Sequence, residues 1–210
     1  VGQIAIGYNS LGALTSGAGN TAVGYQSADA VTTGINNTAI GYEALSTATV
    51  TAGQDEHTAV GYQALKDCSG DRNTAIGTSA MSGVDNSDNC VAVGYEALKT
   101  SGTTNANIDG TTAIGYQSLT GLTSGQKNTA IGYKAGETYN GNNSVIIGYE
   151  AGLDADGSSG NSTLIGMEAG KHLDDGTYNT AIGIEAMKSN SGGGNNALGN
   201  TCVGWRAGDL

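Results

Sequence analysis

The sequence contains no proline and no phenylalanine, and only 13% of its 210 residues are charged. A disordered chain would carry more charge and a smaller apolar fraction than the 38% found here, so the composition argues against disorder. Lys and Arg number only eight, and the net charge is −11. Because phosphate-binding surfaces need clustered Lys and Arg, we expect binding neither to nucleic acid nor to an anionic membrane.

The chain has only three cysteines, Cys68, Cys90 and Cys202. An odd number without paired spacing predicts neither a disulfide framework nor a metal site. Cys90 and Cys202 replace motif residues, and we expect them to be small apolar filler. No stretch resembles a signal peptide or a membrane span, so we expect no membrane insertion.

One hexapeptide, Asn-Thr-Ala-Ile-Gly-Tyr, recurs with small changes in twelve copies, at intervals of 16 to 21 residues. Each copy is too short to bury a core alone, so the copies must stack on one another. We therefore expect residues 1–210 to form a single β-solenoid repeat domain, a rod that is a fragment of a longer fibre. The central glycines, called position 0 below, are Gly7, Gly24, Gly41, Gly61, Gly77, Gly94, Gly115, Gly132, Gly148, Gly166, Gly183 and Gly204.

The residues before each central glycine predict a short strand. Position −1 is β-branched in all twelve copies, position −2 is Ala in nine, and position −3 is Thr in nine. Alternation places −3 and −1 on one face and −4 and −2 on the other, and β-branched residues favour strands. We predict a strand from −4 to about +1, with the −1 row in the core. That row includes Ile40, Val60, Ile76, Val93, Ile114, Ile131 and Ile147.

The rest of each unit predicts turns and a second short strand. Position +1 is Tyr in eight copies, position +3 is always Ala or Ser, and a polar connection follows. We predict an all-β parallel β-solenoid of about twelve coils, each about 17 residues long, with two short strands and two turns. Coils stacked about 4.8 Å apart give a rod roughly 55 Å long, in which each motif position forms a structural ladder. The glycine and tyrosine ladders include Gly41, Gly61, Gly94, Gly115, Gly132, Tyr42, Tyr62, Tyr95, Tyr116 and Tyr133.

A single thin rod is expected to leave one apolar face in water, with the Tyr or the Ala ladder on it. A contiguous exposed patch of that length usually marks an interface. We therefore predict a homo-oligomer whose chains run parallel to one another along the rod axis.

The units 20–25 (Asn-Thr-Ala-Val-Gly-Tyr) and 128–133 (Asn-Thr-Ala-Ile-Gly-Tyr) resemble the head repeats of trimeric autotransporter adhesins. Those repeats follow the pattern Asn-Ser-Val-Ala-Ile-Gly, with a small residue at +3. The Tyr at +1 and the longer period are more similar to repeats in the fibres of tailed phages and large algal viruses. The resemblance implies a left-handed parallel β-roll, a parallel homotrimer, and attachment to a cell-surface receptor or glycan. It implies a location in a virion tail fibre or at a cell surface; the longer, irregular period leaves phage, other viral and bacterial origins open.

The residues that commonly carry chemistry do not converge. His57 occupies a −4 position and His172 lies about seven coils away, so neither a shared metal site nor a Ser-His-Asp set is expected. The segment Asp154–Gly157 resembles the opening of a calcium loop, but the full twelve-residue pattern is missing. We interpret it as a solvated turn, as we do the pairs at 85/88 and 174/175. We expect no enzymatic activity and no cofactor.

Position +2 carries a run of charges in the last five units. Three glutamates about 5 Å apart would repel one another in a buried ladder, so we place this row on the outer surface or at a wet edge of the interface. The cations at its two ends are too far away to neutralise its middle. The run is Lys134, Glu150, Glu168, Glu185 and Arg206.

Three longer connections, 46–56, 99–110 and 188–199, are candidate recognition loops, because insertions in a solenoid project from one face. The leading functional hypothesis is a structural and adhesive fibre segment, with a bacterial adhesin head as one alternative. A second alternative is an ice- or surface-binding solenoid, suggested by the Thr at −3. Against it stand the Ile and Val on the same face and the irregular loops. A depolymerase with paired carboxylates is a further, less favoured class.

Overall fold

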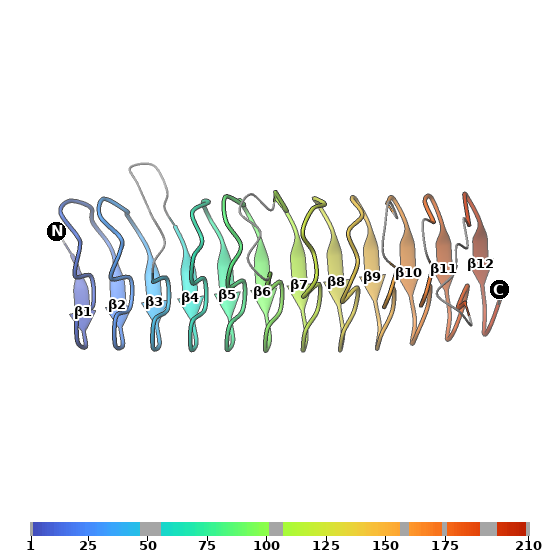
Figure 1. The fold of residues 1–210 in the computed structure, drawn as a ribbon, viewed down its shortest axis with the longest axis horizontal. Helices are drawn as coiled ribbons and strands as arrows, with labels where there is room; N and C mark the ends of the chain where they lie inside the picture. Colours follow the sequence, from blue (N-terminus) through green and yellow to red (C-terminus); the bar gives the residue numbers. More distant parts are fainter. Residues whose placement is uncertain are drawn as a thin grey trace.

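The computed structural model describes residues 2–46, 56–100, 107–155, 160–173, 176–189 and 197–208. In these ranges the chain forms twelve stacked coils without a helix, and each coil contributes one three-residue strand (Figure 1). All strands belong to one parallel sheet whose order follows the sequence. This confirms the predicted all-β parallel solenoid. The strands are β1 (Ile4–Ile6), β2 (Thr21–Val23), β3 (Thr38–Ile40), β4 (Thr58–Val60), β5 (Thr74–Ile76), β6 (Val91–Val93), β7 (Thr112–Ile114), β8 (Thr129–Ile131), β9 (Val145–Ile147), β10 (Thr163–Ile165), β11 (Thr180–Ile182) and β12 (Thr201–Val203).

The register of the sheet is that of the motif, so equivalent positions lie directly above one another. Thr21 pairs with Thr38, for example, and Val23 with Ile40. Coil-to-coil hydrogen bonds continue beyond the strands: the Glu43 N–H donates to the Tyr25 carbonyl at 2.9 Å. Each coil is therefore fastened to its neighbours around much of its circumference.

The predicted second strand is wrong: residues +1 to +4 form turns in every coil. The cause lies in the backbone, because positions +2 and +4 both have a positive φ in all twelve coils. Left-handed residues alternating with ordinary ones bend the chain inward and are incompatible with a strand. The first strand is shorter than predicted for a related reason. The central glycines have φ between 128° and 143°, which ends the strand at −1.

Close approach between coils explains why position 0 is always glycine. A Cβ atom on Gly115 would lie 2.3 Å from the carbonyl oxygen of Gly132 in the next coil. The same overlap with the following coil recurs at each central glycine from Gly7 to Gly183. Only a residue without a side chain allows the backbones to stack at the spacing that the sheet requires.

The core contains the −2 row rather than the −1 row. Ala39, at −2, is fully buried, whereas its neighbour Ile40, at −1, is 40% exposed. The predicted alternation is correct, but the assignment of the −1 ladder to the core is wrong. The interior of one coil is narrow, so small side chains enter from the strand and larger ones enter from +4 on the opposite wall. The large buried residues at +4 are Leu45, Leu65, Met81, Leu98, Leu119 and Met187.

The −4 row forms a polar ladder along the inside of the strands. The Asn20 side chain accepts a hydrogen bond from the Asn37 N–H at 2.9 Å and donates to the Gly34 carbonyl at 2.8 Å. His57 takes the same place in its coil: its N–H donates to Asn37 Oδ1, and its Nδ1 accepts from the Asn73 N–H. These side chains satisfy buried backbone donors that would otherwise be costly.

Glycine replaces the large +4 residue where another side chain fills the same volume. In the coils of β9 and β10, the −2 alanine is replaced by Ile146 and Leu164, and a Cβ on Gly170 would lie 2.7 Å from Leu164 Cδ2. In the β8 coil, whose −2 residue is still alanine, a Cβ on Gly136 would lie 2.9 Å from Leu119 Cδ2 and 3.2 Å from Ile146 Cδ1 in the adjacent coils, and 3.3 Å from the Cβ of the buried Tyr139. Tyr139 Oη lies 2.5 Å from Ser144 Oγ, and burial raises the pKa of its phenol to about 12. The side chains that fill the interior therefore differ from coil to coil, while their total volume stays nearly constant.

We expect the variants Gly170→Met and Leu164→Ala to compensate each other. Leu164→Ala alone leaves a cavity costing about 2–4 kcal/mol, and Gly170→Met alone overpacks the coil by about 1–3 kcal/mol. Together they recreate the Ala/Met pair found at Ala181 and Met187. Thermal melts followed by circular dichroism should show the double variant more stable than the sum of the single effects predicts.

The control combines Gly170→Met with Leu65→Ala, in a distant coil, where the two effects should add. If the stability effects of Leu164→Ala and Gly170→Met simply added, the proposed compensation of volume between these two positions would be contradicted.

Candidate interaction face

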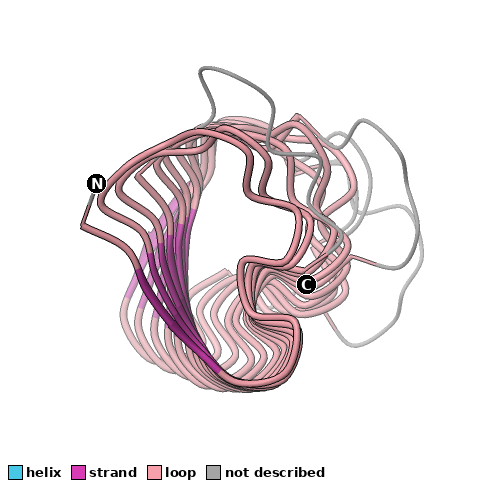
Figure 2. Ribbon diagram, turned by 90° about the vertical axis from the view of Figure 1, so that its left-hand side faces the viewer, coloured by secondary structure: helices cyan, strands magenta, loops and turns pink. Residues whose placement is uncertain are grey.

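The outer side of the sheet presents three parallel rows of uncharged side chains, which we call the outward face. It consists of positions −3, −1 and +1 of every coil. In each of the strands β2 to β11, the first and third residues are partly or largely exposed and the middle one is buried. Figure 2 shows the strands aligned along one wall of the coil. The outward face therefore runs along the whole described rod.

Of the two ladders considered for the face open to water, the Tyr ladder at +1 is exposed and the Ala ladder at −2 is buried. The rings form two stacks with centroids 5.1–5.3 Å apart and interplanar angles of 6–15°. Thr78, which is exposed, separates the two stacks. Stacked rings at this distance attract each other beyond the area that they bury. The stacks are Tyr8–Tyr25–Tyr42–Tyr62 and Tyr95–Tyr116–Tyr133–Tyr149.

The +2 row lies beside the tyrosines, partly exposed, and its charges are neutralised by a second row. Lys171 Nζ lies 2.6 Å from Glu150 and 3.2 Å from Glu168, so one lysine joins two coils. Lys188 also pairs with Glu168, and Arg206 pairs with Glu185 at 2.7 Å. These lysines stand at +5, three residues after the glutamates, and were not among the residues expected from the sequence to neutralise them.

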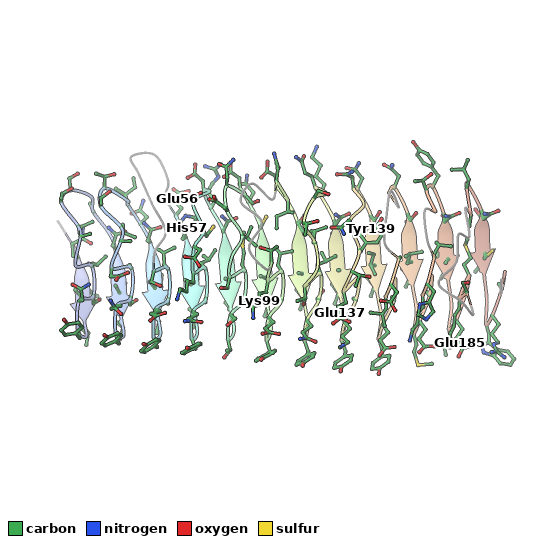
Figure 3. The ribbon with its side chains drawn as sticks, viewed as in Figure 1. Glu56, His57, Lys99, Glu137, Tyr139 and Glu185 are labelled. Carbon is green, nitrogen blue, oxygen red and sulfur yellow. The ribbon has the colours of Figure 1, made fainter. Side chains whose placement is uncertain are left out.

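The same arrangement recurs earlier in the chain. Lys66 Nζ lies 2.7 Å from Glu43 in the preceding coil, and Lys99 Nζ lies 2.7 Å from Glu96 in its own coil. In the β8 coil the order is reversed, with Lys134 at +2 and Glu137 at +5. Figure 3 labels Lys99, Glu137 and Glu185 along this edge of the rod. Opposite charge at a spacing of three is the sequence signal for the pairs within a coil, such as Lys99 with Glu96, but not for the pairs between coils, such as Lys66 with Glu43.

These ion pairs keep the glutamates ionised. Hydrogen bonds from Lys188 and Lys171 lower the pKa of Glu168, and the bond from Lys171 lowers the pKa of Glu150. Lys66 does the same for the pKa of Glu43, and Lys99 for the pKa of Glu96. A general acid needs a raised pKa. The row is therefore suited to joining coils rather than to proton transfer.

The remaining candidates from the sequence do not meet at one place. His172 Nδ1 lies 3.3 Å from Asp154 Oδ2 on the surface, while His57 is buried in the −4 ladder. Asp88 accepts a hydrogen bond from the Asp71 N–H, and Asp85 accepts one from Ser69. Within the described ranges, no three His, Cys, Asp or Glu residues are grouped to hold a metal ion.

Other candidates fall wholly or partly outside the described residues. These are Asp156, the pair at 174/175, most of the connections 46–56 and 188–199, and half of the connection 99–110.

The cysteines behave as packing residues. Cys68 and Cys90 are fully buried, and burial raises the pKa of the Cys68 thiol to about 12 and that of the Cys90 thiol to about 11. Thiols with such high pKa values are poor nucleophiles. Cys202, at −2, packs where a Cβ on Gly208 would otherwise lie.

The described part of the chain contains no helix, and therefore none that could cross a membrane. Comparisons of the chain with protein-family models, with curated proteins and with solved structures found no match.

We expect acid to weaken the contacts between coils. The pKa values of the paired glutamates are lower in the folded chain, so their contribution to stability is present above the ordinary carboxyl pKa. It is lost as the pH falls through the folded-state pKa values. Melting temperatures measured from pH 7 down to pH 3 should therefore decrease.

The variant Lys171→Met should lower stability by about 0.5–1 kcal/mol at pH 7. Its difference from the parent chain should shrink as the pH falls towards 3, because the glutamates take up protons and lose their attraction to Lys171. The control is Lys127→Met, on a lysine outside this row. An equal effect of Lys171→Met at both pH values would contradict the role of the ion pairs.

Proposed function

We propose that this chain is a structural and adhesive segment of an extracellular fibre, in which three parallel copies pack through their outward faces. The observation that carries the proposal is the row of partly or largely exposed Ile and Val beside the tyrosine stacks. The winding would be that of a left-handed β-roll, as the resemblance of the repeats to adhesin heads and viral fibres implies. The fibre would attach a virion, or a bacterial cell, to a surface receptor or glycan.

The size of the outward face supports association with further copies. A strip from −3 to +1 is about 13 Å wide, and over a rod of about 55 Å it covers roughly 700 Å². The largest apolar patch on a typical monomer is about 300–600 Å², whereas one side of a standard interface covers about 800 Å². The strip is therefore large enough to form an interface and too large for an ordinary monomer surface.

The distribution of charge also favours the outward face as the surface where copies associate. The chain carries a net charge of −11, but no residue at −3, −1 or +1 in any of the twelve motif copies is charged. Copies of an acidic chain repel one another except where uncharged apolar area is buried between them. The occupant that we propose for the outward face is accordingly a second and a third copy of this chain.

Association would also give the rod its adhesive property. Three parallel copies repeat every surface site three times, so a weak affinity for a glycan or receptor is multiplied by effective concentration. No reaction chemistry is involved in this function.

Sedimentation equilibrium should give a mass three times the 20.8 kDa of one chain. The variants Ile114→Lys and Ile131→Lys place charges in the middle of the outward face and should yield monomers, because a buried unpaired charge is costly. Tyr178→Lys is the matched control, since Tyr178 is 63% exposed but lies outside the motif rows.

Binding to host cells or surface polysaccharide should fall at least about tenfold in the monomeric variants, because multivalency is lost. A parent chain that stays monomeric at all concentrations would refute the proposed trimer.

A second candidate function is binding to ice or to another ordered surface. It is favoured by one observation: the Thr side chains at −3 face outward in register, where the sequence analysis had placed them beside a core row. A thermal-hysteresis assay tests it, with Thr129→Lys as the disrupting variant and Thr177→Lys as the control outside the sheet. Hysteresis that is absent in the parent chain, or unchanged in Thr129→Lys, removes this candidate.

A further inference from the structure

The tyrosine row is interrupted at one coil, that of β5, where Thr78 stands at +1. The first stack ends at Tyr62 and the second begins at Tyr95, two coils further along. Two coil spacings amount to about 10 Å. A ring placed midway would lie about 5 Å from each neighbour, which is the spacing of 5.1–5.3 Å within the stacks. The gap is therefore one aromatic ring wide.

The two tyrosine rings that border the gap are more exposed than the rings inside the stacks, as expected if each has one uncovered ring face. Tyr62 and Tyr95 are 48% and 46% exposed, whereas the rings inside the stacks are 41–43% exposed. Thr78 itself is exposed, so its side chain does not fill the space. Position +2 is small in the same coil, where Ser79 replaces the long Gln, Glu or Lys of neighbouring coils. Ser79 itself is buried, so the opening is confined to the +1 row.

The walls of this gap are held in place before anything binds. Tyr62 stacks on Tyr42 with an interplanar angle of 10°, and Tyr95 stacks on Tyr116 with an angle of 9°. The hydrogen bonding between coils also continues through the β5 coil, because the Ser79 N–H donates to the Tyr62 carbonyl and the Glu96 N–H donates to the Thr78 carbonyl. Little ordering is then required on binding, which favours affinity.

The polar groups next to the gap are already paired. The Gln63 amide donates to Glu43 at 2.8 Å, and Glu96 accepts from Lys99 and Gln117. A ligand that enters the gap therefore meets two ring faces and a threonine, rather than a free charge. This environment suits a planar uncharged ring.

We propose that the gap at Thr78 is a binding site for one aromatic ring, which intercalates between Tyr62 and Tyr95 and completes the stack. Its ligand class is phenolic: a free phenol, or the tyrosine side chain of a partner protein. The gap lies on the outward face, so it is open in a single copy and would be covered where copies pack together as proposed above.

The test uses p-cresol as the probe, with saturation-transfer difference NMR on the full chain carrying Ile131→Lys, which should keep the outward face uncovered; all further variants are made in this chain. N-acetyl-tyrosinamide is titrated in parallel. Binding of both ligands assigns the site to side chains presented by proteins as well as to free phenols, while binding of p-cresol alone assigns it to free phenols. Cyclohexanol, which is similar in size but has no aromatic face, should bind at least about tenfold more weakly than p-cresol.

Three variants locate the site. Thr78→Tyr fills the gap and should weaken p-cresol binding at least about tenfold, because both stacking faces are lost. Met167→Tyr adds a ring at the same motif position beyond the end of the second stack, and should leave binding unchanged. Tyr116→Thr opens a second gap of the same kind between Tyr95 and Tyr133, and should about double the number of sites.

Circular dichroism melts would check that each variant keeps its fold. Unchanged binding in Thr78→Tyr, equal binding of cyclohexanol, or no binding of p-cresol to the Ile131→Lys chain would each overturn the proposal.

Discussion

The structure depends on backbone hydrogen bonds between coils that are stacked in register. A strand of three residues has no stability by itself, and each one gains its partners only from the coils above and below. The same register that pairs Thr21 with Thr38 also brings the central glycines together, where a Cβ would overlap the next backbone. Glycine at position 0 is therefore a condition for stacking, and the other motif positions take their environments from it.

The narrow interior that follows from this stacking sets the second constraint. Alanine from the strand faces a large residue from +4 in most coils, and the reverse arrangement occurs where Leu164 faces Gly170. The left-handed φ of +4 makes glycine a suitable replacement at this position, because glycine adopts such a φ without strain. Large residues tolerate the same φ in the other coils because burying their side chains offsets the conformational cost.

The outer surface is divided between two kinds of row. The uncharged outward face offers apolar area for association, while the row beside it joins neighbouring coils by ion pairs such as Lys171 with Glu150 and Glu168. In a regular rod of this kind, a distinct local site arises only where the repeat is broken. At Thr78 the tyrosine row lacks one ring, and the resulting gap differs from every other site along the row.

The sequence by itself determined the solenoid, the number of coils, their parallel register and the alternation within each strand, because a repeated motif imposes one conformation on every copy. It also indicated that the Tyr or the Ala ladder would be exposed. Which side of the strand faces inward was decided only by the tertiary structure. Ile40 and Ala39 are both apolar, and the side chain that enters a coil depends on how sharply the chain bends after the strand. That bend comes from left-handed residues at +2 and +4, such as Glu43 and Leu45, whose types give no sign of it. The ion pairs likewise depend on the inter-coil distance, which brings Lys66 to Glu43 across 23 residues of sequence.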